Sequence, residues 1–195
     1  MDRSAATAFH TQHTLPLPPA AVTNATDSKL AHKAFWVMTR RVTVMAAGVD
    51  FALLLLFLYF DAPLLAWLNL ISISLYGCAY WLLTRRMNTP AIALIWIEVL
   101  GHAAIGSMLI GWDSGFHYYL LMFIPAIVVS AGSKLRPYTL LLLLFVFYIG
   151  LHTVARRVRP TVPLANTGLW VVHGFNVAGV FAMAASTARF YFRTV

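Results

Sequence analysis

Residues 91–112 read AIALIWIEVLGHAAIGSMLIGW, and this stretch decides the fold class. A membrane-spanning helix needs about 20 apolar residues in succession, and only Glu98 and His102 interrupt this run with ionisable side chains. The whole chain is 61% hydrophobic and 10% charged, whereas soluble domains carry about 25% charged residues. The sequence therefore predicts an all-α integral membrane protein.

Five other apolar runs resemble this one, and turn residues separate them. The six predicted spans are residues 42–60, 64–83, 91–112, 116–131, 137–155 and 168–187. Loops this short join antiparallel neighbours in a bundle. We therefore predict three regions: a disordered cytoplasmic tail (1–28), an amphipathic interfacial helix (29–41) and a six-span transmembrane domain (42–195).

Basic residues gather on one side of the predicted bundle. They are Arg40, Arg41, Arg85, Arg86, Lys134, Arg136, Arg189 and Arg193. Cytoplasmic loops carry an excess of Lys and Arg, so both termini are expected in the cytoplasm; the family resemblance described below implies a bacterial inner membrane. The net charge of +8 follows from these loops and gives no reason to expect nucleic acid as a partner. The single cysteine, Cys78, excludes an internal disulfide.

One basic cluster lies on the opposite, outer side. Arg156 and Arg157 follow the fifth span and should face outward. We expect these guanidinium groups to neutralise an anion, either haem propionates or the headgroups of the lipid bilayer.

Four histidines lie within or beside the spans: His102, His117, His152 and His173. Ionisable side chains are costly in a bilayer, so each is a functional candidate, and imidazole is a common axial ligand of haem iron. The expected depths of these histidines in the membrane suggest two pairs, His102 with His173 and His117 with His152. Each pair would hold one iron, which predicts one or two haem b groups.

Two carboxyl groups lie deeper in the predicted bundle. Glu98 is four residues before His102 on the same helical face, so it would either orient the imidazole or stay protonated in the core. Asp50, on the first span, would join a polar network with Asn69 or Ser72. A di-iron carboxylate site is not expected, because the Glu98 and His102 pattern does not recur.

Residues 98–103 (EVLGHA) and 109–120 (LIGWDSGFHYYL) carry a family resemblance. They resemble the six-helix membrane domains that precede the catalytic domains of bacterial membrane-bound adenylyl cyclases and diguanylate cyclases. The resemblance implies a homodimeric sensory module with a cyclase output domain on the same chain, and some such modules bind haem b. No Gly-Gly-Asp-Glu-Phe motif occurs, so this chain alone is expected to have no catalytic activity.

Three functions remain open at this point. The first is a haem b sensor that relays redox or ligand state through the sixth helix, with a quinone or a periplasmic redox partner. The second is a receptor for a small lipophilic signal without haem, in which the histidines bind a polar headgroup. The third is an electron-transfer cytochrome b subunit.

Overall fold

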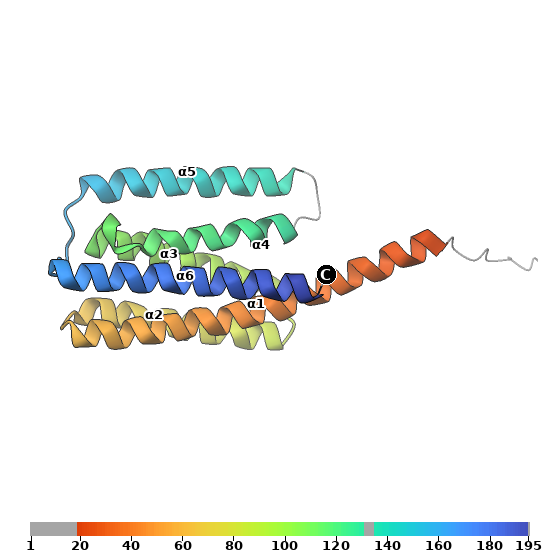
Figure 1. Cartoon of the computed structure of the whole chain (residues 1–195), viewed down its shortest axis with the longest axis horizontal. Helices are drawn as coiled ribbons and strands as arrows, with labels where there is room; N and C mark the ends of the chain where they lie inside the picture. Colours follow the sequence, from red (N-terminus) through yellow and green to blue (C-terminus); the bar gives the residue numbers. More distant parts are fainter. Residues whose placement is uncertain (1–18, 131–134, 195) are drawn as a thin grey trace, which may run out of the picture.

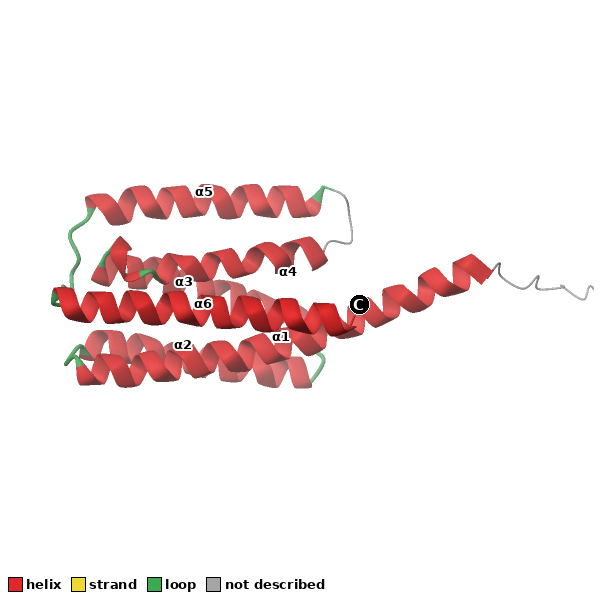
Figure 2. Ribbon diagram, viewed as in Figure 1, coloured by secondary structure: helices red, strands yellow, loops and turns green. Residues whose placement is uncertain are grey.

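The computed structural model describes residues 19–130 and 135–194, and in that part the chain forms helices and short loops without strands (Figure 2). The α-helices are α1 Pro19–Tyr59, α2 Pro63–Thr84, α3 Asn88–Ile110, α4 Phe123–Ser130, α5 Arg136–Arg157 and α6 Asn166–Thr194. Two 3-10 helices, η1 Trp112–Ser114 and η2 Phe116–Met122, connect α3 to α4. The predicted all-α bundle is confirmed.

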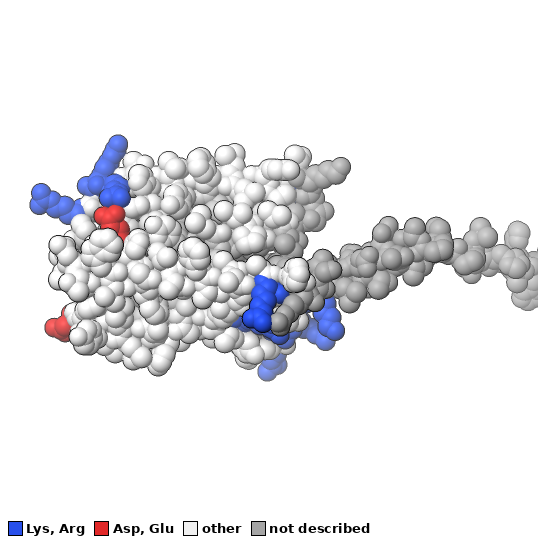
Figure 3. Space-filling model, viewed as in Figure 1, with Lys and Arg blue, Asp and Glu red and all other residues white. Residues whose placement is uncertain are grey.

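Five helices are long and apolar enough to cross a membrane: Lys33–Tyr59, Pro63–Thr84, Asn88–Ile110, Arg136–Arg157 and Asn166–Phe190. On the face drawn in Figure 3, charged residues gather at the two ends of the bundle and the surface between them is uncharged. Large apolar side chains such as Trp170 and Phe181 of α6 are also exposed. This surface is the kind that lipid covers, and with the five long apolar helices it suggests a multi-pass membrane protein.

The first helix differs from the prediction. It runs from Pro19 to Tyr59 without a break, so residues 19–28 are helical rather than disordered, and 29–41 is the same helix as the first span. Proline and glycine, which end helices, are absent between Pro19 and Gly48. Nothing in the sequence therefore stops the helix at residue 41. The rest of the predicted tail, residues 1–18, lies outside the described residues.

The predicted fourth span, 116–131, is also not one α-helix. Its first half is the 3-10 helix η2 and its second half is the short helix α4. Pro125 lies in the first turn of α4, because proline lacks the N–H that a helix interior requires and is tolerated at a helix start. An α-helix that began at Phe116 would place Pro125 in its interior.

The helices pack mainly with neighbours in sequence, but α6 does not. Helices α1, α2 and α3 pack in order, and α5 packs against α4 at the edge of the bundle (Figure 1). Helix α6 packs instead against α1 and η2. The segment between α5 and α6 is fixed by the Val162 N–H, which donates to the Leu109 carbonyl at 2.8 Å. Helix α6 therefore lies beside the centre of the bundle.

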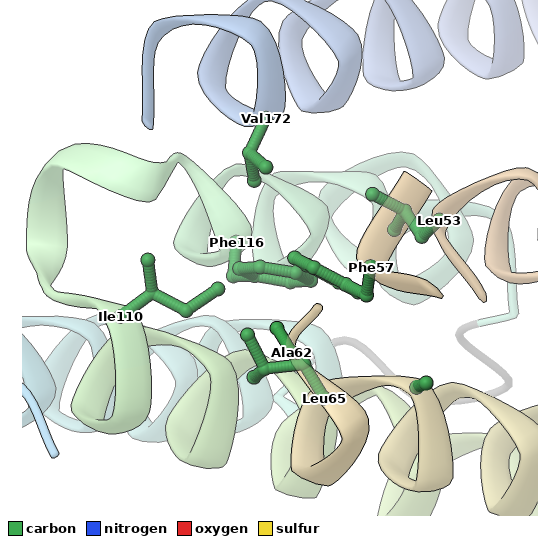
Figure 4. Close-up of a cluster of buried hydrophobic side chains, with 8 residues drawn as sticks. Leu53, Phe57, Ala62, Leu65, Ile110, Phe116 and Val172 are labelled. Atoms are coloured by element: carbon green, nitrogen blue, oxygen red, sulfur yellow. The ribbon is translucent and has the colours of Figure 1, made fainter. Parts of the chain in front are cut away.

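A turn between two glycines positions η2. Gly111 and Gly115 have φ values of +109° and +83°, a backbone conformation that glycine adopts without steric cost. Between them the Ser114 hydroxyl donates to the Gly111 carbonyl at 2.6 Å. The turn directs Phe116 into a buried cluster, where its ring stacks on Phe57 with centroids 6.4 Å apart (Figure 4).

Candidate functional site

Three ionisable side chains meet in the middle of the bundle: Asp50 from α1 and Glu98 and His102 from α3. We call them the polar triad. Each is at least nine-tenths buried, and one ligand atom from each lies within 4.8 Å of one from each of the others. Asp50 is nine residues from the end of α1 at Tyr59, or roughly 14 Å along the helix axis. The triad is therefore deep within the predicted membrane region.

The His102 imidazole is held by two neighbours. Its Nδ1 atom is 2.6 Å from the Ser72 hydroxyl of α2 and 3.3 Å from Glu98 Oε1, one helical turn earlier. The two residues thus lie on one helical face, as the four-residue spacing indicates. The two partners suggested for Asp50 make their hydrogen bonds elsewhere. Ser72 contacts His102, and the Asn69 amide donates to the Leu65 carbonyl at 2.7 Å.

Several polar atoms of the triad have no hydrogen-bond partner among the described residues. They are Asp50 Oδ2, Glu98 Oε2 and His102 Nε2. A buried polar atom without a partner costs about 1–3 kcal/mol, and most such atoms in folded proteins are paired. The three atoms lie in one cluster, and the described residues leave them without partners.

The triad lies on the wall of a cavity of about 710 Å³. Binding pockets for small molecules are mostly 300–1,000 Å³ in volume, with apolar walls and a few polar groups. This cavity fits that description, because its lining includes Trp36, Val42, Trp96, Phe123, Ile127 and Met183. Tyr76, Tyr119 and Thr187 add hydroxyl groups to the same wall.

The other three predicted histidines lie elsewhere. His117 is buried and stacks on Trp112 with ring centroids 3.6 Å apart, and the half-exposed His173 has Nδ1 2.8 Å from the Asp113 carbonyl oxygen. His152 is exposed, and its ring is nearly perpendicular to that of Trp112, with the two ring centroids 4.7 Å apart. The predicted neighbours His117 and His152 thus share one indole.

Of the predicted pair of His102 and His173, only His102 lines the 710 Å³ cavity. The His102 ring lies 5.1 Å from the Phe116 ring. His117 and His152 are also outside the lining of this cavity. Haem binding through a pair of them stays a prediction, and we derive no step through haem.

One of the two outer arginines, Arg156, has a protein partner. Arg156 Nη2 is 3.0 Å from Asp113 Oδ1, and both side chains are more than half exposed. Arg156 and Arg157 line a small hollow with Trp112 and Pro160, separate from the cavity that contains His102. The carboxylate of Asp113 is therefore an anion that Arg156 neutralises. Sequence analysis did not identify this pair, because the two residues are 43 positions apart.

A second buried polar network was also not predicted. The fully buried Asn176 of α6 donates from Nδ2 to the Ser114 carbonyl at 2.9 Å, and its Oδ1 accepts from the Tyr119 hydroxyl at 3.2 Å. Tyr119 also lines the cavity. Asn176 is a polar residue within an apolar run, which indicates a buried polar contact. Its partners, however, depend on how α6 packs.

No family model, curated protein or solved structure matches the chain.

Proposed function

We propose that this chain is the membrane-embedded sensory module of a signalling protein, and that it binds a small lipophilic molecule in the cavity beside the polar triad. The observation that carries the proposal is an apolar cavity of about 710 Å³ whose lining residues include the three that carry the buried, unpaired polar atoms. An apolar body would fill the cavity, and a polar head would pair with the triad. A ligand from the lipid phase would satisfy both.

Helix α6 offers a route from this cavity to an output domain. Met183 and Thr187 of α6 line the cavity, and α6 then continues to Thr194. A ligand that contacts these side chains favours one packing of α6 against α1 over another, which is what a ligand needs in order to shift a conformational equilibrium. Hydrogen exchange of the last turns of α6 should change when the ligand binds, and an unchanged rate would contradict this route.

The wider setting is part of the same proposal. We place both termini in the cytoplasm of a bacterium and the loop at Asp61 outside, because Arg85, Arg86 and Arg136 would then lie on the cytoplasmic side. The module would act as a homodimer joined to a cyclase output domain. A cysteine introduced at Asp61 should react with an impermeant thiol reagent on intact cells, and one at Arg86 should not.

The proposal is tested with decanol, a neutral probe with an apolar body and a hydroxyl head. Bound at 100 times its dissociation constant, a ligand stabilises the folded state by about 2.7 kcal/mol. Decanol should therefore raise the Tm of the protein in lipid nanodiscs. Decane, which lacks the hydroxyl, should raise it less, because the triad atoms stay unpaired.

A matched pair of variants distinguishes the cavity from the lipid-facing surface. Ala126→Trp places an indole in the cavity and should abolish the effect of decanol. Ala184→Trp adds the same ring to an exposed position on α6 and should retain it. An equal Tm rise in both variants would mean that decanol acts through the bilayer, and the proposal would be wrong.

Haem b is the competing prediction, and one observation favours it: His102 Nε2 is a buried imidazole nitrogen without a hydrogen-bond partner. Arg156 and Arg157 would face the propionates in that account. An absorbance spectrum of protein produced with added haem, before and after dithionite, decides between the two. A Soret band that His102→Ala removes would favour haem.

A further inference from the structure

The polar triad has the composition of a metal site. Two carboxylates and one imidazole come from two helices, α1 and α3, and one ligand atom from each lies within 4.8 Å of one from each of the others. Carboxylate oxygen and imidazole nitrogen together suit first-row divalent ions such as Zn²⁺, Fe²⁺ and Mn²⁺. Three protein ligands with one open position is the usual arrangement of a zinc ion that interacts with a further ligand.

The charges of the triad also favour a bound cation. Asp50 and Glu98 are buried carboxyl groups in a membrane bundle, and among the described residues the ion pairs within 4.0 Å include no Lys or Arg partner for either. Buried charges in proteins are paired or bind metal ions. A divalent cation would neutralise both carboxylates, and it would use the atoms Asp50 Oδ2 and Glu98 Oε2 that have no hydrogen-bond partner.

The imidazole is positioned as metal-binding imidazoles are. A histidine that binds a metal through one nitrogen usually donates a hydrogen bond from the other, which fixes its tautomer and orientation. The Ser72 hydroxyl lies 2.6 Å from His102 Nδ1, and His102 Nε2 is buried without a partner. When Nδ1 carries the proton, it donates a hydrogen bond to the Ser72 oxygen, and Nε2 has a free lone pair.

From these observations we propose that Asp50, Glu98 and His102 bind one divalent transition-metal ion. Zinc ligands lie about 2.0–2.2 Å from the metal, so the three side chains would move together by roughly 1 Å from their present 4.8 Å separation. All three residues line the 710 Å³ cavity, so the ion would lie beside it. The inference rests on the proposed function in one respect: the ion would bind the head of the lipophilic ligand.

Zinc binding by the full chain in lipid nanodiscs tests the site. After chelator treatment, equilibrium dialysis with Zn²⁺ and elemental analysis should find one ion per chain, with Ca²⁺ bound much more weakly. Asp50→Asn, Glu98→Gln and His102→Gln should each weaken zinc binding by about tenfold or more. Asp113→Asn and His173→Gln make the same chemical changes outside the triad and should bind Zn²⁺ as the wild type does.

Ser72→Ala provides a variant that keeps all three ligands. Loss of a group that orients a metal ligand weakens metal binding by about 10–100-fold, so this variant should show an intermediate affinity. Circular dichroism establishes that each variant is folded. Co²⁺ should also give visible absorption bands in the wild type that His102→Gln removes, which a bystander ion on the surface would not do.

Two results would overturn the inference. One is a folded wild-type protein that binds no stoichiometric Zn²⁺, and the other is zinc binding that survives all three triad substitutions. The proposed function fails separately, because decanol binding is measured in the presence of a chelator. A decanol-dependent rise in Tm without zinc binding would retain the cavity as a ligand site and refute the metal site.

Discussion

Gly106 offers a sharp test of how η2 packs on α3. A Cβ atom added to this glycine would lie 2.7 Å from Cγ of Phe116 and 2.9 Å from Cδ2. Ordinary contacts of a Cβ atom fall at 3.4–4 Å, so Gly106→Ala forces the Phe116 ring or the helix to shift by roughly 0.7 Å or more. The structure therefore predicts that this single methyl group destabilises the protein.

The magnitude follows from the surroundings of Phe116. Its side chain is fully buried and stacks on Phe57, which is also fully buried, and Leu65, Ile110 and Val172 belong to the same cluster (Figure 4). The ring has no open space to enter. Insertion of a methylene-sized group into a well-packed core costs about 1–3 kcal/mol. Alanine in place of glycine returns up to about 1 kcal/mol through helix propensity.

Gly101→Ala on the same helix separates the two contributions. A Cβ atom at Gly101 meets no other atom within 4 Å, so this variant has the propensity gain without the collision. The free energy of unfolding of Gly106→Ala should therefore be lower than that of Gly101→Ala by about 1–3 kcal/mol. For a chain of this length the difference corresponds to a Tm difference of roughly 2–4 °C for each kcal/mol.

The assay is thermal unfolding of both variants and the wild type in one detergent, followed by circular dichroism. Equal Tm values for Gly106→Ala and Gly101→Ala would refute the packing of Phe116 between α3 and the neighbouring helices. The placement of η2, and with it the wall of the cavity at Tyr119, would then be wrong.

Two further predictions concern the polar contacts of the bundle. Asn176→Ala should lower the free energy of unfolding by about 1–3 kcal/mol, because it leaves buried partners on η1 and η2 unpaired. Ser74→Ala, at an exposed position, should change the Tm little, and similar Tm values for the two variants would contradict the network. Arg156→Ala should change the free energy of unfolding by less than about 1 kcal/mol, because its ion pair with Asp113 is more than half exposed on both sides. Thermal unfolding at low and high salt measures this effect, and a loss of several degrees would show that Arg156 has a further partner.

The helices could be predicted from the sequence because each depends on local composition. Residues 64–83 and 137–155 were predicted as spans and lie within α2, Pro63–Thr84, and α5, Arg136–Arg157. The same reasoning places Glu98 and His102 on one helical face, since residues four apart on a helix are neighbours. In both cases the prediction uses only residues that are close together in the sequence.

Other features of the site depend on tertiary packing. Depth along separate helices suggests the pair of His102 and His173, but depth does not specify which face of each helix turns inward. Helix α6 packs against α1, η1 and η2, and His173 meets the carbonyl of Asp113 in η1. The meeting of Asp50 with Glu98 and His102 depends in the same way on the packing of α1, α2 and α3, which no local pattern specifies.

The central claim is that the cavity beside the polar triad binds a lipophilic molecule. It is tested most directly by photolabelling the wild-type protein with a diazirine derivative of decanol and mapping the labelled residues by mass spectrometry. We expect labelling at cavity residues such as Ala103 and Met183, competed by unlabelled decanol and absent in Ala126→Trp. Labelling confined to exposed residues such as Trp170 and Phe181, without competition, would contradict the account.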